Sequence, residues 1–339
     1  MSFTKRKRVI VGVILFALLA AFLLKLKWAK DEKITLRVSY MQKAITLDSL
    51  TDIAEKKGFF EKNNVIIKKV PSVKVLEPLL IKKNADVALT TGIPAMKGFL
   101  DDHKIKVIAI VNNYNPLFFS TSRFPVSRYP KKAIKMVRNV GISIHTSVTV
   151  PRHMVERLLF SILLKNMGVD IKQVSIIEIP QESARAAALL RGELDLAFFD
   201  TEKIRDQLEE MDTFTFLDAH ELFKDFYVPN EIVITDEALK KKPEAAKRFV
   251  KSIYQAIKYV DKNKEEIITY FEKQHNLPRK DADILYKSLI ESRANLDYVP
   301  SEENMADFIE AAIDQTTPKN PDRDINQFFF KDFAEAAIK

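Results

Sequence analysis

Residues 85–94 have the sequence ADVALTTGIP, and this stretch decides the fold class. Its first six residues form a short, mainly apolar run, which predicts a buried strand. Gly92 and Pro94 follow at once, and a proline in the first turn is typical of a helix start. A buried strand that leads directly into a helix is half of a parallel β-α-β unit. The stretch therefore predicts an α/β fold.

The same alternation of strand and helix patterns precedes and follows this stretch. Residues 34–40 and 65–70 are strand-like, and the helix pattern between them ends at Gly58. Residues 73–83 have a helix pattern that Pro78 interrupts, and residues 104–111 (KIKVIAIV) predict a further strand. These segments together predict one complete α/β unit.

A second α/β unit begins after the polar segment 120–130. Residues 226–235 then predict a strand that returns to the first unit, and from residue 236 onward the chain is almost entirely helical in pattern. Within that tail, residues 244–261 carry apolar side chains on one helical face. The strands and helices expected in the second unit are residues 139–144, 150–167, 174–179, 183–190 and 194–199.

The formal net charge of +8 belongs almost entirely to the first 30 residues, which contain seven basic residues and no acidic one. The remainder carries a net charge of only +1. A nearly neutral body argues against nucleic acid as a partner.

The basic residues 5–8 precede an uncharged apolar run at residues 9–24, which is the pattern of an export signal. No clean small-x-small cleavage site follows, so we favour an uncleaved signal-anchor over residues 1–30. The alternative is a cleaved signal that releases a soluble periplasmic protein. The positive-inside rule places residues 31–339 outside the cytoplasm.

Several classes of active site are excluded by composition. The chain has no cysteine, so it has no disulfide, no thiol nucleophile and no lipid-modified cysteine. It has only 7 glycines, without a G-x-G-x-x-G or a P-loop pattern. Its 5 histidines form no H-E-x-x-H motif, and no G-x-S-x-G elbow is present. We therefore expect no catalytic residue, no metal and no cofactor.

Four segments, in the right order, resemble one protein family. Residues 54–66 resemble the A-x-x-x-G-F-F opening of periplasmic solute-binding proteins of the nitrate, sulfonate, taurine and thiamine-precursor group. Residues 79–90 resemble its L-x-x-G-x-x-D-V-A strand, with Asn84 where the family has glycine. Residues 140–142 and 179–195 resemble the start and the middle of its second lobe. Since asparagine tolerates left-handed backbone, we expect Asn84 to replace that glycine directly.

The resemblance implies a two-lobed, type II periplasmic-binding-protein-like α/β fold with a helical C-terminal tail, preceded by an N-terminal apolar helix. It implies hinge crossings at residues 117–122 and 226–230. The expected parts are residues 1–30 as the signal-anchor, 33–122 as the first part of lobe one, 123–225 as lobe two, and 226–339 as the return to lobe one with the tail.

Ligands of open α/β sheets bind at the carboxyl ends of the strands, and helix starts there favour anions. The hydroxyl, amide and aromatic side chains at those ends are the candidate ligand-binding residues. They are Tyr40, Gln42, Thr90, Thr91, Asn113, Tyr114, His145, Thr146, Ser147, Asp200, Tyr227 and Asn230. We expect Asp86 and Asp195, by contrast, to cap or pair structurally.

The resemblance implies the solute-binding component of an ATP-driven importer, with a small-molecule solute, ABC permease and ATPase subunits, and the inner membrane as partners. One alternative is an extracytoplasmic ligand sensor that acts through a partner. The other is a periplasmic enzyme on the same fold. The solute class stays open between an oxyanion and an organic molecule such as a vitamin precursor, and we favour the organic class because no arginine lies in the expected loops.

Overall fold

The structure is a computed structural model, and its described residues cover most of both α/β units. The described residues are 32–40, 45–72, 76–113, 117–121, 130–142, 157, 160–161, 164–165, 168–199, 208, 211, 213–218, 229–293, 298–300, 308–310, 312–313 and 316–338.

The first α/β unit forms a five-stranded sheet in the order β2-β1-β3-β10-β4. Strand β1 pairs in parallel with β2 and β3, whereas β10 runs antiparallel between β3 and β4. The strands are β1 (Ile34–Tyr40), β2 (Val65–Pro71), β3 (Val87–Thr91), β4 (Ile105–Asn113) and β10 (Pro229–Thr235).

The second unit forms another five-stranded sheet, in the order β7-β6-β8-β5-β9. Here β5 runs antiparallel between β8 and β9. The strands are β5 (Leu117–Thr121), β6 (Asn139–Ile142), β7 (Ser175–Glu178), β8 (Leu196–Phe198) and β9 (Phe214–Asp218). In each sheet, the strand that directly follows a crossing of the chain is therefore antiparallel to its neighbours.

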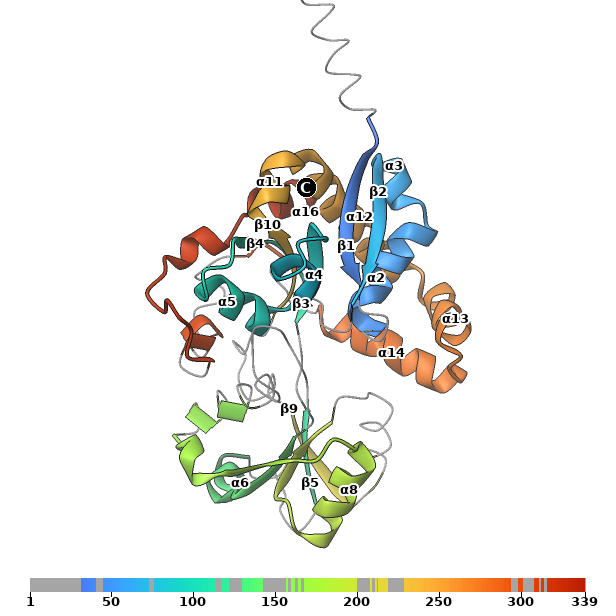
Figure 1. Ribbon diagram of the computed structural model, residues 1–339. Coiled ribbons are helices and arrows are strands. Elements are labelled where there is room, and N and C mark those ends of the chain that lie inside the picture. Colours follow the sequence, from blue (N-terminus) through green and yellow to red (C-terminus); the bar gives the residue numbers. More distant parts are fainter. Residues whose placement is uncertain are drawn as a thin grey trace, which may run out of the picture.

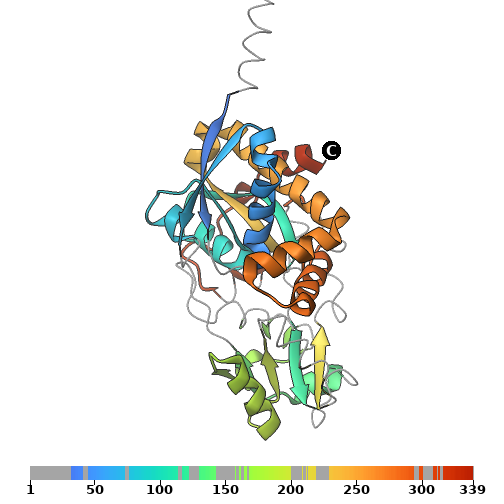
Figure 2. The same ribbon diagram turned by 90° about the vertical axis from the view of Figure 1, so that its right-hand side faces the viewer.

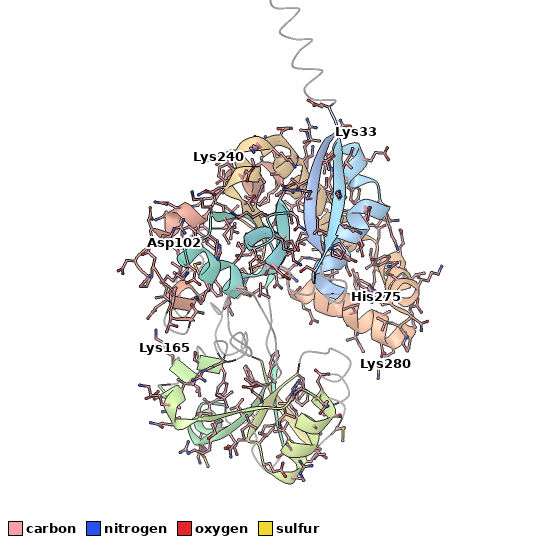
Figure 3. The ribbon with its side chains drawn as sticks, in the orientation of Figure 1. Lys33, Asp102, Lys165, Lys240, His275 and Lys280 are labelled. Carbon is pink, nitrogen blue, oxygen red and sulfur yellow. The ribbon has the colours of Figure 1, made fainter. Side chains whose placement is uncertain are left out.

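The two sheets lie one above the other, and the chain crosses between them twice (Figures 1 and 2). The first crossing joins β4 to β5 and the second joins β9 to β10. The end of the first sheet that lies away from the second carries Lys33, before β1, and Lys240 (Figure 3). The opposite end of the first sheet, where the crossings start and finish, is called the crossing edge below.

Helices cover the first sheet and form the C-terminal tail. They are α2 (Ile45–Lys56), α3 (Phe59–Lys62), α4 (Glu77–Leu80), α5 (Gly92–Leu100), α11 (Asp236–Lys241), α12 (Pro243–Lys262), α13 (Lys264–His275), α14 (Arg279–Glu291), the 3-10 turn Ile325–Phe328 and α16 (Asp332–Ile338). The second sheet carries α6 (Pro130–Met136), the 3-10 turn Ile171–Gln173 and α8 (Glu182–Arg191).

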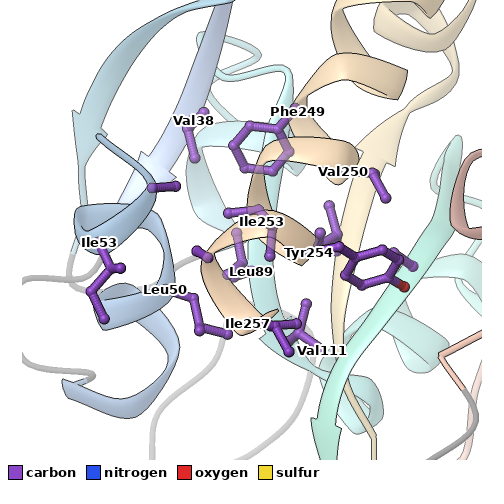
Figure 4. Close-up of a cluster of buried hydrophobic side chains, with 14 of the residues drawn as sticks. Val38, Leu50, Ile53, Leu89, Val111, Phe249, Val250, Ile253, Tyr254 and Ile257 are labelled. Atoms are coloured by element: carbon purple, nitrogen blue, oxygen red, sulfur yellow. The ribbon is translucent and has the colours of Figure 1, made fainter. Parts of the chain in front are cut away.

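The apolar face predicted over residues 244–261 is confirmed in α12. Phe249 and Ile253 are fully buried and pack into one cluster with Val38 of β1 and Leu89 of β3 (Figure 4). Burial of this kind stabilises a fold by about 2 kcal/mol per large side chain. Helix α12 thus fixes one face of the first sheet and holds its strand ends in place.

The left-handed backbone predicted from the sequence is confirmed at two glycines, and the prediction is wrong at one asparagine. Gly58 and Gly192 adopt left-handed backbone at helix ends, with φ of 67° and 75°. Before β3 the left-handed residue is Lys83, with φ of 52°, and not Asn84. In the described part of the helix expected over residues 73–83, only α4, Glu77–Leu80, is helical. The short α4 ends earlier than expected, so the left-handed turn falls one residue earlier.

Residues 117–121, expected to cross between the lobes, instead form β5 inside the second sheet. Phe118 and Phe119 are fully buried there and face Phe198 and Ala197 of β8. Burial of two adjacent phenylalanines, one on each face of the sheet, favours a central strand over an exposed connection.

Among the described residues, no helix is long and apolar enough to span a membrane. The expected signal-anchor, residues 1–30 with the apolar run 9–24, lies outside the described residues.

Candidate functional site

The crossing edge brings together the ends of three adjacent strands. Strand β3 ends at Thr91, β4 ends at Asn113, and β10 starts at Pro229. Both chain crossings leave from this edge, so it faces the second sheet. It is therefore the part of the first sheet where a ligand held between the two sheets makes contact.

Three polar residues lie side by side near this edge, one row inside the pair Pro229 and Asn113. Asn230 is opposite Thr91 of β3 and opposite Asn112 of β4. Directly opposed residues in an antiparallel pair point to the same face, so the three side chains are neighbours. We call Thr91, Asn230 and Asn112 the polar row. Both asparagines are almost completely buried, with 4% and 3% exposure.

The two amide oxygens of the polar row have no hydrogen-bond donor among the described residues. Asn112 donates through Nδ2 to Ser292 Oγ at 3.4 Å, while its Oδ1 meets no donor from the part of the chain that the structure describes. The same holds for Oδ1 of Asn230. A buried acceptor without a donor is uncommon, so both atoms are available to an incoming group.

Helix α5 starts at this edge. Thr91 is its N-cap, but the hydroxyl makes no capping hydrogen bond. The backbone N–H groups of a first helical turn have no intrahelical acceptor. Because Pro94 has no N–H group, the donors at this helix start are the N–H groups of Gly92 and Ile93. A Cβ on Gly92 would lie 2.8 Å from Phe308 Cζ and 3.0 Å from Pro229 Cγ. Glycine is therefore needed here because the C-terminal tail packs directly against the helix start.

The predicted binding residues separate into two groups in the structure. Thr90, Thr91, Asn113 and Asn230 lie on adjacent strands at the crossing edge. Tyr40 ends β1, the neighbour of β3, at the same edge; its hydroxyl donates to Asp52 Oδ2 at 3.0 Å and Lys69 Nζ lies 4.8 Å from its ring centre. The remaining predicted residues lie outside the described part of the chain: Gln42, Tyr114, His145, Thr146, Ser147, Asp200 and Tyr227.

Sequence reasoning missed Glu231, the most unusual residue of the edge. It is completely buried in β10, an interior strand of the sheet, and neither carboxyl oxygen has a partner among the described residues. Burial raises the pKa of the Glu231 carboxyl well above its ordinary value. A lone glutamate within the otherwise apolar run 231–234 was the available signal.

The helical tail brings a second unpredicted residue, Arg293, next to Ser292. Its guanidinium is almost fully buried and binds Asp261 through Nη2 at 2.5 Å. Asp261 balances the charge of Arg293, although Nη1 has no partner in the described chain. The sequence around residue 293 does not predict the burial of Arg293 or its ion pair with Asp261, because both depend on how α14 packs.

The opposite end of the first sheet has a different chemistry. Asp86 accepts hydrogen bonds from Arg37 Nη2 at 2.6 Å and from Lys242 Nζ at 2.9 Å. Burial alone would raise the pKa of Asp86, but these hydrogen bonds outweigh it and lower the pKa. As expected, Asp86 acts structurally, and Asp195 likewise accepts from the backbone N–H groups of Arg138 and Asn139.

Asp86 lines a hollow of about 750 Å³ whose rim is rich in lysine, including Lys83, Lys104 and Lys240. A second hollow of about 220 Å³ lies between α2 and α13. Among the residues that the structure describes, no group of three histidine, aspartate or glutamate side chains has the arrangement of a metal site.

A family model described as the NMT1-like family matches residues 29–270, which is more than half of the chain. The chain belongs to the NMT1-like family. Comparison with curated proteins gives no significant match to this member of the family.

Several solved structures with this fold are periplasmic binding proteins. A putative sulfonate-binding SsuA from Methylobacillus flagellatus KT superposes with a TM-score of 0.70 at 15% identity, over 91% of this chain and 94% of that one. The aliphatic sulphonate-binding SsuA from Escherichia coli gives 0.66 at 14% identity, over 88% and 92%. The nitrate-binding NrtA from Synechocystis PCC 6803 gives 0.53 at 17% identity, over 80% and 74%. The NMT1-like chain thus has the periplasmic-binding-protein fold.

Proposed function

We propose that this NMT1-like protein is the solute-binding component of an ATP-driven importer. A small organic or oxyanionic solute binds between the two sheets, the lobes close on it by bending at the two crossings, and the closed form is recognised by an ABC permease with its ATPase. The observation that carries the proposal is the crossing edge. There, polar side chains without partners among the described residues lie at the strand ends where such folds bind ligands.

We assign residues 33–113 and 226–339 to one lobe and 117–225 to the other, which moves the expected boundary at residue 122 to before β5. The sheet topology supports this division, because β10 completes the first sheet after the chain has passed through the second. The transition falls close to residue 114, since β5 already pairs in the second sheet.

The protein acts on the periplasmic face of the inner membrane, held by residues 9–24 as a signal-anchor. The charge distribution supports this placement, because the basic residues precede an apolar run and the body is nearly neutral. Mass spectrometry of the protein from washed membranes tests it. Retention of residues 1–30 is expected, and a mature chain that begins after residue 24 would contradict the anchor.

A melting-temperature screen tests the binding function. The full chain in detergent is heated with methanesulfonate, taurine, nitrate, benzamidine, 4-aminopyridine, pyrimidines and flavins in turn. A solute at about 100 times its Kd stabilises the folded state by about 2.7 kcal/mol, which raises Tm by about 5 °C. If no member of these chemical classes moves Tm, the importer assignment is wrong.

A pair of variants tests the place of binding. Thr91→Phe puts a large side chain at the centre of the crossing edge and is expected to abolish the solute-induced Tm shift. Ile81→Phe places the same side chain at a position of the same lobe that is 61% exposed, and is expected to keep the shift. A full shift in Thr91→Phe would move the binding site away from the crossing edge.

One observation favours a second candidate, a periplasmic enzyme. Glu231 is a buried carboxyl with a raised pKa, which is the property of many general acids. Mass spectrometry of the solute after incubation with the protein distinguishes the two functions. The importer component returns the solute unchanged, whereas an enzyme returns a product.

A further inference from the structure

The lysine-rimmed hollow at the far end of the first sheet has no part in the proposed solute site. Its volume is about 750 Å³, and its lining comes from the segments that precede β3 and β4 and from helix α11. The same end of the sheet carries Lys33, which directly precedes β1, and Lys240 (Figure 3). The hollow is therefore separate from the crossing edge, at the opposite end of the same strands.

Three lysines of the hollow are available to an anion. Lys83, Lys104 and Lys240 are exposed, and none of them forms an ion pair with the part of the chain that the structure describes. They come from three separate segments: the turn after α4, the residue before β4, and α11. The fold thus brings three unpaired cations from distant parts of the sequence to one hollow.

The acidic residues of the hollow do not neutralise these lysines. Its lining has six lysines and arginines against four aspartates and glutamates. Asp86 is held by two of the cations, Arg37 and Lys242, and Glu237 is paired with Lys241. The hollow therefore keeps an excess of positive charge, although residues 31–339 as a whole carry a net charge of only +1.

The sequence places this end of the first sheet nearest to the proposed membrane anchor. Nine residues separate Leu24, the last residue of the apolar run, from Ile34, the first residue of β1. An extended chain spans at most about 3.5 Å per residue, so β1 starts no more than about 35 Å from the end of the run. Because Lys33 and the hollow lie at the same end of the sheet, an anchor at residues 9–24 brings the hollow close to the bilayer.

An anionic bilayer has the chemistry that this hollow lacks. Lipids such as phosphatidylglycerol expose negatively charged phosphate groups, which attract lysines that lie close to the surface. The attraction falls off within a Debye length, about 8 Å at physiological ionic strength, so the lysines must approach closely. Attachment through residues 9–24 makes this approach an intramolecular event, so a patch of only three unpaired lysines is sufficient.

We propose that the lysine-rimmed hollow binds the phosphate groups of anionic lipids in the membrane that holds the anchor. Lys83, Lys104 and Lys240 make the contact, which holds lobe one against the bilayer and leaves lobe two free to close on the solute. The proposal rests on the anchor of the proposed function and adds the surface through which the body of the protein contacts the membrane.

Lipid quenching on the full chain in vesicles tests the contact. Because the chain has no cysteine, Ile81→Cys introduces one fluorophore beside the hollow, at a position that is 61% exposed, and Arg191→Cys introduces one in lobe two. Each protein is reconstituted into phosphatidylcholine or into equal parts of phosphatidylcholine and phosphatidylglycerol, with a nitroxide-headgroup lipid as quencher. Quenching at residue 81 is expected to be at least about threefold stronger in the anionic vesicles, and quenching at residue 191 is expected to be equal in both.

Two triple variants separate this hollow from a general effect of charge. The hollow variant carries Lys83→Gln, Lys104→Gln and Lys240→Gln. The control variant removes the same charge from exposed lysines of lobe two and carries Lys132→Gln, Lys135→Gln and Lys172→Gln. In anionic vesicles, quenching at residue 81 is expected to fall in the hollow variant to the level seen in phosphatidylcholine, and to stay unchanged in the control variant.

The possible results separate the lipid contact from the anchor. Equal quenching at residue 81 in both kinds of vesicle, or quenching that survives in the hollow variant, would overturn the contact. Displacement by inorganic phosphate at an ionic strength at which chloride has no effect would assign the hollow to a soluble anion and would also overturn it.

Flotation of the same vesicles tests the anchor independently. Protein that floats with both kinds of vesicle but shows no lipid contact at residue 81 contradicts the inference and leaves the anchor in place. Protein that does not float with either kind of vesicle contradicts both the anchor and the inference.

Discussion

The two ends of the first sheet each contain a buried carboxyl group, and the two groups differ in their hydrogen-bond partners and in the direction of their pKa shift. At the end away from the second sheet, Asp86 is 3% exposed and binds both Arg37 and Lys242. At the crossing edge, Glu231 is completely buried and has no partner among the described residues. The pKa is lowered at the paired group and raised at the unpaired one.

This difference separates a structural charge from a buried carboxyl group that the fold does not compensate. The Asp86 cluster joins β1, β3 and the start of α12, so its hydrogen bonds hold distant parts of the chain together. Glu231 contributes no such link and makes the folded state less stable when it ionises. Residues kept at a cost to stability are concentrated at functional sites, which agrees with the position of Glu231 at the edge where the chain crosses.

One of the two largest expected effects on stability is at the paired end. Asp86→Asn removes the charge that Arg37 and Lys242 share, and because those partners are about one-third exposed we expect a loss of about 2 kcal/mol in the free energy of unfolding. Urea denaturation measures it. Asp102→Asn is the control, because Asp102 is 65% exposed and 3.9 Å from Arg323, and a change within about 0.5 kcal/mol is expected. Equal losses in both variants would contradict the role of the Asp86 cluster.

Gly92→Ala is expected to destabilise the crossing edge by about 2 kcal/mol, because the added Cβ meets Phe308 and Pro229 in a packed region. Thermal unfolding measures the effect. Thr91→Val, the adjacent variant, removes a hydroxyl that caps nothing and is expected to leave Tm within about 2 °C. An unchanged Tm in Gly92→Ala would show that the tail does not pack against the start of α5.

The pH dependence of stability separates the two carboxyl groups by direction. Asp86 has a lowered pKa, so its contribution is present above its ordinary pKa of 3.8 and is lost as the pH falls below that value. Glu231 has a raised pKa, so its contribution is present below its ordinary pKa of 4.5 and is lost as the pH rises above it. Urea midpoints at several pH values are expected to rise in Glu231→Gln relative to wild type above pH 4.5. A constant difference across that range would contradict an uncharged Glu231.

The smallest expected effect is at Lys83, which joins α4 to the paired end of the sheet. Lys83→Gly is expected to stabilise the protein by about 0.5 kcal/mol, because a φ of 52° strains a lysine and suits glycine. Asn84→Gly is the control and is expected to give no gain, since Asn84 is not left-handed. A gain in Asn84→Gly alone would restore the sequence-based placement of the turn.

Features that depend on near neighbours in the chain could be predicted from the sequence. The period of apolar residues in α12 predicts its buried face, and Gly58 and Gly192 predict two helix ends, because both signals act within one or two helical turns. The placement of Thr90, Thr91, Asn113 and Asn230 at one edge of the sheet was also predictable, since strand ends collect at one edge.

Features that depend on distant pairing could not be predicted. Strand β5 is a strand because Phe118 pairs with Phe198 and with Leu217, which are far away in the sequence. Glu231 is unusual only because β10 lies between β3 and β4, which enclose it on both sides. The position of the Asn112 amide depends on Ser292, whose Oγ accepts a hydrogen bond from Asn112 Nδ2. In each case the local pattern is ordinary and the long-range environment makes the residue important.

The central claim is that the two lobes close on a solute, and one distance measurement tests it most directly. Because the chain has no cysteine, Lys280→Cys and Arg191→Cys introduce spin labels at one site in each lobe. A Lys280→Cys and Lys62→Cys pair within one lobe serves as the control. With the solute that raises Tm most, the inter-lobe distance is expected to shorten and the control distance to stay constant. An inter-lobe distance that does not change when the solute binds would contradict the account.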